Sequence, residues 1–301
     1  MSTPLRLASV ILLGSILSAC GGGGGGGSSG SSASIAGSAI DGPMSGSTVT
    51  AYAISNGARG ATLGSATTDV SGHFSISLGA YAGSVMLQVS GGSYMDEATG
   101  SAMSMSGSTV MTAMVADVGS GQALSGIQIT PLTSMAQAYA QGMAGGMSNA
   151  NITTANTALG NYFGVTVSGA GDILHTAPID PTAGGSASGA SQNAIDYGMA
   201  LAAMSEYAHA QGMTSSSAII TAFMSDAADG VLNGMANGSQ VMMGGMGMSM
   251  GATTAMPRTA GTTGLSTAMS TFLSSAQNQS GVTSSQMQGL MNTLSASNGV
   301  L

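Results

Sequence analysis

The feature that most constrains the fold of this chain is a series of short runs, between residues 34 and 130, in which polar and apolar residues alternate. Such alternation is typical of β-strands with one buried face, because successive side chains of a strand point to opposite sides of a sheet. The runs lie at residues 47–54, 74–78, 85–89, 110–115 and 124–129, and the last two look like a pair. The turn chemistry of residues 69–72 predicts a tight hairpin between two of the strands. Short strands at this spacing predict an antiparallel β-sandwich over residues 34–130.

The pattern changes to a helical one at Thr130. A proline follows at once, and apolar side chains then recur three or four residues apart at Leu132, Met135 and Tyr139, which predicts a helix. Further helical runs lie at residues 152–163, 190–211, 215–228, 262–278 and 283–295. Small residues and glycine-rich links between these runs predict a loose, small-residue-rich helical bundle over residues 131–301. The fold class expected is therefore α+β with two domains.

The first 19 residues have the pattern of an export signal. Arg6 precedes an apolar segment at residues 7–17, which is shorter than the roughly 20 residues that a transmembrane helix needs. The segment ends in Leu-Ser-Ala-Cys, which resembles the lipobox of bacterial lipoproteins. That resemblance implies cleavage before Cys20 and acylation of its thiol. Cys20 is the only cysteine of the chain, so no intramolecular disulfide is expected.

The segment that follows Cys20 consists almost entirely of glycine and serine up to residue 33. We expect residues 20–33 to form an acylated, flexible tether. In the sorting rule of such lipoproteins, an aspartate after the cysteine favours retention in the inner membrane. Gly21 occupies that position here, so we expect the protein to be lipid-anchored in the cell envelope, at the outer membrane.

The chain has very few charged residues, about 5% of its length, where globular proteins have roughly 25%. It has three arginines and no lysine, and removal of the leader would leave two arginines against eleven acidic residues. Nucleic acid is excluded as a partner, because binding to its phosphates depends on Lys and Arg. Electrostatic adhesion to anionic lipids is excluded for the same reason, so membrane attachment would depend on the acyl chains.

Three segments of the first region carry a family resemblance. They are residues 37–52, residues 67–74 with their T-D-x-x-G-x-F turn, and residues 89–100. Together they resemble carboxypeptidase-regulatory-like domains, which are also called transthyretin-like or prealbumin-like. The resemblance covers roughly residues 34–130 and implies an accessory β-sandwich without its own catalytic apparatus. The later segments 130–136 and 155–164 resemble the C-terminal part of uncharacterised bacterial lipoproteins, which implies no activity.

The sequence offers few candidates for chemistry. Asp69 is expected to stabilise its turn rather than to bind calcium, and His73 is expected to face solvent. His209 is interpreted as a residue on a helix face and not as a ligand. Asp226 and Asp229 are interpreted as a solvated helix end, because their surroundings lack the spacing and the terminal glutamate of an EF-hand. Asp172 and His175 are close enough in sequence to form a base and its orienting group, which would need a serine nucleophile.

A methionine cluster is the sharpest chemical oddity of the chain. Within nine residues it contains Met242, Met243, Met246, Met248 and Met250. Thioethers are soft ligands that suit Cu(I), and the cluster resembles the methionine-rich segments of periplasmic copper proteins. The alternative is a Met/Gly-rich loop near residues 235–261 without a metal, since this chain uses methionine widely as a flexible hydrophobic residue.

These observations favour a non-enzymatic binding or scaffolding lipoprotein of the envelope. Its partner would be an envelope or extracellular protein or glycan, and no cofactor is expected. A periplasmic Cu(I)-binding protein that uses Met242–Met250 is the second hypothesis. A hydrolase that uses Asp172 and His175 is the third.

Overall fold

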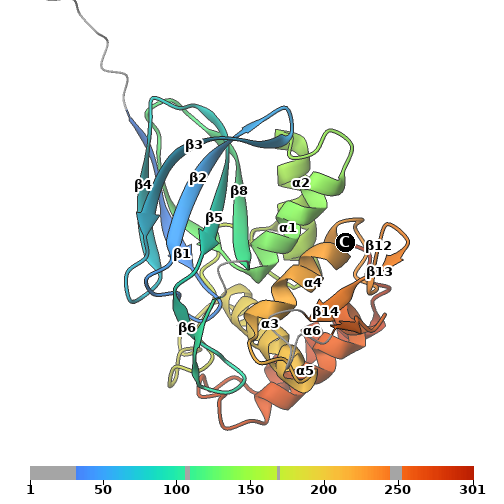
Figure 1. Ribbon diagram of the computed structural model, residues 1–301. Helices are drawn as coiled ribbons and strands as arrows, with labels where there is room; N and C mark the ends of the chain where they lie inside the picture. The colour runs from blue at the N-terminus through green and yellow to red at the C-terminus, as the bar shows by residue number, and fades with distance from the viewer. Residues whose placement is uncertain (1–31, 106–108, 168–169, 245–252) are drawn as a thin grey trace, which may run out of the picture.

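The structure is a computed structural model that describes residues 32–105, 109–167, 170–244 and 253–301. The expected leader, the lipidation site Cys20 and almost all of the tether therefore lie outside the described residues. Within the described part, every helix is too short or too polar to cross a membrane. The architecture is α+β, with strands in the first half and mainly helices in the second (Figure 1).

The strands of the first half form two main sheets. Their bounds are β1 Ala33–Ala39, β2 Thr48–Ser55, β3 Ala58–Thr67, β4 His73–Gly79, β5 Gly83–Ser90, β6 Ser93–Met95, β7 Ala102–Ser104, β8 Val110–Val118 and β9 Ala123–Ile129. A three-stranded sheet has the order β4-β1-β9, a four-stranded sheet has the order β3-β2-β5-β8, and β6 and β7 form a separate hairpin. All five runs that alternation predicted are strands, and β1 begins at Ala33, the last residue assigned to the tether.

The pairing of the strands differs from the expected one in two respects. Residues 69–72 do make a tight turn, but it joins β3 to β4, which belong to different sheets, and β8 and β9 are likewise not paired with each other. In addition, β1 and β9 are parallel, whereas the other pairs are antiparallel. Alternation identifies which face of a strand is buried, but it does not identify the neighbouring strand, so these pairings could not be read from the sequence.

The four-stranded sheet is covered on both faces over β5 and β8, whereas its edge strand β3 is largely exposed. The inward side chains of its central strand β5, such as Leu87 and Val89, share one core with Ile35 and Ile76 of the other sheet. The next residue along, Met86, belongs instead to the core of the helical region. The molecule therefore has three layers, namely a three-stranded sheet, a four-stranded sheet and the helices, and both β5 and β8 are buried on both sides.

The described residues of the second half form six α-helices, all at positions that the helical periodicity predicted. Their bounds are α1 Pro131–Gly142, α2 Asn149–Tyr162, α3 Gln192–Ala210, α4 Ser217–Ala227, α5 Leu265–Leu273 and α6 Ser284–Ala296. Helix α1 packs on α2 and α4, and α5 packs on α3 and α6. Short strand pairs connect them: β10 Thr166–Val167 with β11 Ala170–Gly171, β12 Met235–Ala236 with β13 Ser239–Gln240, and β14 Met242–Gly244 with β15 Thr253–Ala255. The described part of residues 235–261, expected as a loop, thus contains two short antiparallel strand pairs.

Helix α1 covers the edge of β8 that has no neighbouring strand. The contacts are made by the first turn of the helix. Thr130 and Thr133 form a capping box at its first turn, ahead of Pro131. Thr133 donates its hydroxyl proton to the carbonyl of Thr112 in β8, and the Thr112 N–H donates to Ser134 Oγ at 2.8 Å. The first turn of the helix therefore satisfies backbone groups that an uncovered edge strand would leave open to other strands.

Candidate functional site

A group of four acidic side chains lies where the strands meet helix α3. Asp41 is in the connection between β1 and β2, Asp96 and Glu97 follow β6, and Glu206 is on α3. All four are at most 8% exposed. We call these four residues the acidic cluster. Since the whole chain has only eleven acidic residues, more than a third of them are gathered and buried here.

The local turns explain how the acidic cluster is assembled. Gly42 has a positive φ of 65°, and a Cβ at this position would lie 2.2 Å from the carbonyl oxygen of Met95. Only glycine therefore lets the loop with Asp41 approach the end of β6. Asp96 holds the next turn, since its Oδ1 accepts from the N–H and the hydroxyl of Thr99, both at 2.9 Å.

Glu97 joins the three segments. Its Oε1 accepts from the N–H of Gly42 at 2.8 Å, and its Oε2 accepts from the hydroxyl of Ser205 on α3 at 2.6 Å. Burial raises the pKa of Glu97 to about 7, although these donors act in the opposite direction. Near neutral pH this carboxyl group is therefore shared between its protonated and ionised forms.

Asp41 is the least satisfied member of the acidic cluster. It is 2% exposed, and its Oδ2 has no hydrogen-bond partner among the described residues. Burial, together with the charges of Glu97 and Asp96, raises the pKa of Asp41 well above its usual range. The ionised form of Asp41 is disfavoured, because it would place a further charge beside Glu97 without a compensating donor.

Glu206 is the member of the acidic cluster whose side chain borders a solvent-accessible cavity. It lines a cavity of about 380 Å³ between α3 and α5, together with Tyr207, Thr259, Thr263, Thr267 and Thr271. Burial raises the pKa of Glu206 and the charge of Asp96 adds to the effect, whereas His209, one turn further along α3, lowers it. His209 lies on α3, the helix expected there, and is exposed.

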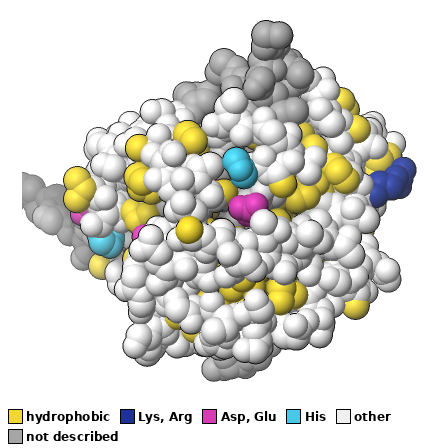
Figure 2. All heavy atoms as spheres, turned by 90° about the horizontal axis from the view of Figure 1, so that it is seen from below, with side chains coloured by type: hydrophobic (Ala, Val, Ile, Leu, Met, Phe, Trp, Pro, Cys, Tyr) yellow, Lys and Arg dark blue, Asp and Glu magenta, His cyan; other side chains and the backbone are white. Residues whose placement is uncertain are grey.

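The end of the molecule that carries this cavity is poor in charge. Seen from below, that face displays mostly uncharged polar and apolar side chains, with one acidic side chain and one histidine side by side at a hollow near its centre (Figure 2). Helix α5 lies at the bottom of Figure 1, whereas β1 begins at the top, where residue 32 enters the described part. The cavity therefore faces away from the point at which the chain enters the fold.

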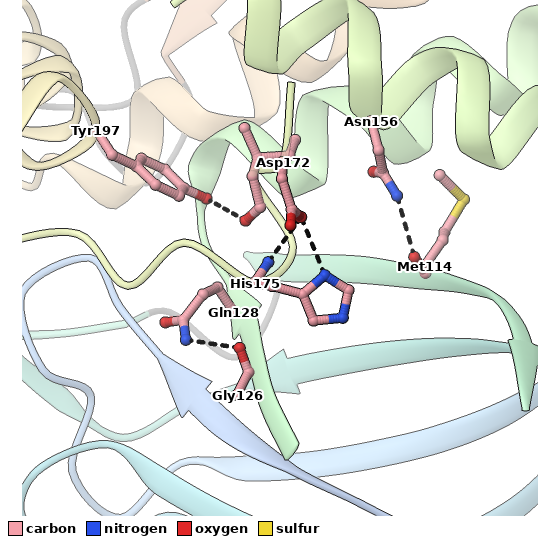
Figure 3. A network of polar contacts seen from close by, with 8 residues as sticks. Met114, Gly126, Gln128, Asn156, Asp172, His175 and Tyr197 are labelled. Atoms are coloured by element: carbon pink, nitrogen blue, oxygen red, sulfur yellow. Dashed lines mark hydrogen bonds and ion pairs between the residues drawn. The ribbon is translucent and has the colours of Figure 1, made fainter. Parts of the chain in front are cut away.

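Asp172 and His175 lie together as predicted. Asp172 Oδ1 accepts from the backbone N–H of His175 and contacts its ring Nδ1, both at 3.0 Å (Figure 3). The pair belongs to a turn that also contains Ile173, whose carbonyl accepts from the buried Tyr197 hydroxyl at 3.0 Å. The His175 side chain is 51% exposed, and among the described residues its ring bonds only to Asp172. The arrangement stabilises a turn and presents no serine nucleophile among the described hydrogen bonds.

Asp226 and Asp229 differ from the expectation of a solvated helix end. Asp226 is fully buried, and its Oδ1 accepts from three consecutive backbone N–H groups, those of Asn233, Gly234 and Met235. Burial raises its pKa to about 6, and its Oδ2 has no partner among the described residues. The sequence interpretation missed this because the loop that folds back onto the helix end is defined only by the tertiary structure. Asp229 is exposed and caps the same loop through the N–H groups of Val231 and Asn237.

The methionine cluster is only partly described. Met242 and Met243 lie in β14, whereas Met246, Met248 and Met250 lie outside the described residues. Met243 is 1% exposed and belongs to the helical core, while Met242 is 50% exposed on the opposite face of the strand. A side chain packed in the core is not free to turn towards a metal ion, so Met243 does not fit the predicted Cu(I) ligand set. The described residues form no group of three or more His, Cys, Asp or Glu side chains suited to a metal ion.

The remaining predictions concern the first region. Asp69 accepts from the N–H groups of Ser71 and His73, as turn chemistry predicted, and His73 is exposed. The acidic cluster was not predicted. The adjacent acids Asp96 and Glu97, in a chain almost without charge, were the one signal that could have drawn attention to it.

A scan against protein-family models matches no family, and a search of the curated proteins finds no match. The resemblance to carboxypeptidase-regulatory-like domains therefore stays a prediction.

Proposed function

We propose that this protein is a non-enzymatic lipoprotein of the cell envelope, held at the outer membrane by acyl chains on Cys20, and that it binds its partner through the Glu206 cavity. The two sheets of the first half would then be a transthyretin-like or immunoglobulin-like β-sandwich that serves as the support. One observation carries this proposal. The cavity lies at the end of the fold opposite to the one where the chain enters at residue 32.

The reason is geometric. A glycine- and serine-rich tether attached at the start of β1 would place that end of the protein nearest the membrane. The α3 and α5 end would then project into the surrounding space, where a soluble or envelope-bound partner can reach it. Nearly uncharged side chains and hydroxyl groups on this face suit a neutral or positively charged partner, such as a protein or a glycan, and not a nucleic acid.

The anchoring is tested by fractionation of wild-type and Cys20→Ser cells. We expect the wild-type protein to stay in the membrane fraction at high salt and to be released only by detergent, since hydrophobic anchoring is insensitive to ionic strength. The Cys20→Ser variant should leave the membrane fraction. Release of the wild-type protein by salt alone would contradict lipid anchoring.

Binding through the cavity is tested by retention of envelope components on the immobilised protein. Thr271→Trp places a large side chain at the rim of the cavity, and Thr293→Trp is its matched control on α6. Both threonines are exposed, and each hydroxyl bonds to the carbonyl four residues earlier in its helix. We expect Thr271→Trp alone to abolish retention. Equal retention by both variants would place the partner elsewhere.

The absence of catalysis is tested with broad ester and glycoside screens of the wild-type protein and of Asp172→Asn. We expect no turnover above background in either. Turnover that is lost in Asp172→Asn would instead support the hydrolase hypothesis, with His175 as the base.

The exposure of Met242 favours Cu(I) binding as the second candidate. Gly244 pairs with Thr253, so the two ends of the segment that contains Met246, Met248 and Met250 lie next to each other. Competition with a Cu(I) chelator should show weaker binding when Met242, Met246, Met248 and Met250 are replaced by Leu, whereas Met243→Leu should have no effect. No difference between the wild-type protein and the fourfold variant would eliminate this candidate.

A further inference from the structure

Glu206 lines the cavity with a carboxylate that has no hydrogen-bond donor among the described residues. It is 8% exposed and accepts no hydrogen bond from any described residue. Its oxygens are not among the side-chain atoms that are shut off from water without a partner, so the carboxylate is open to the water of the cavity. Glu97, by comparison, accepts from both Gly42 and Ser205. The carboxylate of Glu206 is thus short of a donor at the place where it lines the cavity.

Within the described part of the protein, the one positive group that acts on this carboxylate comes from its own helix. The charged groups that act on Glu206 are His209 from the same helix and Asp96 from the turn after β6, and Asp96 is repulsive. Arg258 lies in sequence between two residues that line the cavity, Pro257 and Thr259, yet it forms no ion pair with Glu206 in the structure. None of the residues that line the cavity is a Lys, Arg or His, so the lining itself carries no cationic side chain.

The cavity also contains hydroxyl groups that can accept hydrogen bonds. Thr263, Thr267 and Thr271 recur every four residues, which places them along one side of α5 and the turn before it. The Thr271 hydroxyl donates to the carbonyl of Thr267, so its lone pairs stay available. A primary ammonium group has three donors and no acceptor. It therefore suits a site with one carboxylate and several hydroxyl oxygens, whereas a metal ion would need the convergent ligands that the described residues lack.

We propose that the Glu206 cavity recognises a small molecule or side chain through a protonated primary amine, with Glu206 as the counter-charge and the threonines of α5 as hydrogen-bond acceptors. This inference rests on the proposed binding role of the cavity and adds the chemistry of its ligand. A volume of about 380 Å³ lies within the usual size of small-molecule sites, which is roughly 300–1,000 Å³. Only a short aliphatic amine or the amine end of a larger partner would fit.

The test is calorimetric titration of the full-length protein, purified in non-ionic detergent, with putrescine as the probe. Butane-1,4-diol has the same length without charge, and succinate has the opposite charge. We expect binding of putrescine only, and a loss of at least tenfold in affinity for Glu206→Gln, which keeps the shape and removes the charge. Asp117→Asn is the matched control, because it removes one exposed acid from β8 and leaves the cavity unchanged.

The outcomes separate cleanly. Putrescine affinity that is unchanged in Glu206→Gln, equal binding of butane-1,4-diol, or no binding to the wild-type protein would each overturn the inference. Thr271→Trp provides a second variant at an exposed position, and it should block putrescine where Thr293→Trp does not. Retention of an envelope partner that depends on Thr271 but shows no putrescine binding would leave the proposed function standing and refute the amine. Putrescine binding without any retained partner would support recognition of the amine and refute the proposed binding of an envelope partner.

Discussion

The hydroxyl of Ser205 on α3 donates a hydrogen bond of 2.6 Å to Oε2 of Glu97, which lies 108 residues earlier in the chain. Both residues are buried, so this bond fastens the strand-rich half to the helical half without access to water. Tyr94, three residues before Glu97, makes a second link, because its hydroxyl accepts from the N–H of Ser217 at the start of α4. The short hairpin of β6 and β7 thus links the strand-rich half to the helical half.

The first prediction concerns pH. Burial raises the pKa of Glu97 to about 7 from its ordinary value of 4.5, so the folded state holds its proton more tightly than the unfolded state does. The stability that this proton contributes is fully present below about pH 4.5 and is lost as the pH rises to about 7, on the order of 3 kcal/mol. Thermal unfolding followed by circular dichroism should show a melting temperature that falls over this interval. Asp41 acts in the same direction.

Glu97→Gln isolates the contribution of Glu97. Its amide oxygen can still accept from Gly42, and its NH₂ group can donate to Ser205 Oγ, so the contacts are kept while the titration is removed. We expect a smaller dependence of the melting temperature on pH and a stability at pH 8 no lower than that of the wild type. A melting temperature that falls as steeply in the variant as in the wild type would show that Glu97 is not the titrating group.

The second prediction concerns the hydrogen bond between Ser205 and Glu97. Ser205→Ala removes one donor and leaves Oε2 of Glu97 buried and unpaired, which should lower the free energy of unfolding by about 1–3 kcal/mol. Chemical denaturation measures this difference. Ser225→Ala is the control, because its hydroxyl bonds only within its own helix, to the carbonyl of Thr221, and it should change stability by less than about 0.5 kcal/mol. Equal changes in the free energy of unfolding for the two variants would show that the bond between Ser205 and Glu97 does not stabilise the contact between the two halves.

The third prediction concerns Asp226. Its Oδ1 holds the N–H groups of Asn233, Gly234 and Met235, so Asp226→Ala would leave three donors without their acceptor. We expect a loss of at least about 2–3 kcal/mol, together with faster hydrogen exchange at residues 233–235. Asp226→Asn keeps an acceptor oxygen and should lose less than half as much. Protection of these amides that persists in Asp226→Ala would show that another group holds the loop.

The fourth prediction concerns the start of α1. Thr130 Oγ1 lies 2.6 Å from the Tyr197 hydroxyl and also accepts from the N–H of Thr133 as the helix cap. Thr130→Ala loses both contacts and should cost about 2 kcal/mol, at the upper end of the range for caps. Tyr197→Phe should cost about 1–2 kcal/mol. In a double-mutant cycle the combined loss should be smaller than the sum, because the two variants remove one shared bond. Strict additivity would mean that this bond contributes nothing.

Much of the secondary structure could be predicted because it depends on local spacing. The alternation at residues 85–89 indicated β5, and Pro131 after Thr130 indicated the start of α1. The sheet partners could not be predicted. The alternation of polar and apolar residues indicates which face of a strand is buried, but it does not indicate which strand lies beside it. Strand β1 pairs in parallel with β9, about 90 residues later, because the tertiary fold brings them together.

The candidate site residues also divide into those that local sequence predicted and those that only the tertiary structure revealed. Asp172 and His175 were predicted as a pair because three residues separate them, and the turn indeed brings them to 3.0 Å. Asp226 was assigned to solvent because nothing near it in sequence indicates that residues 233–235 close over it. Met243 was grouped with its neighbours, although a strand places adjacent side chains on opposite faces and so sends it into the core.

By itself the sequence indicated the helices and five of the strands, though not β3, β6 or β7, and it indicated a chain with almost no positive charge. These properties depend on neighbours within a few residues and on composition. Only the tertiary structure decided that Asp41, Glu97 and Glu206, which are far apart in the chain, share one buried region. The physical reason is that burial, and with it the pKa and the need for a partner, is a property of the whole packed fold and not of any segment.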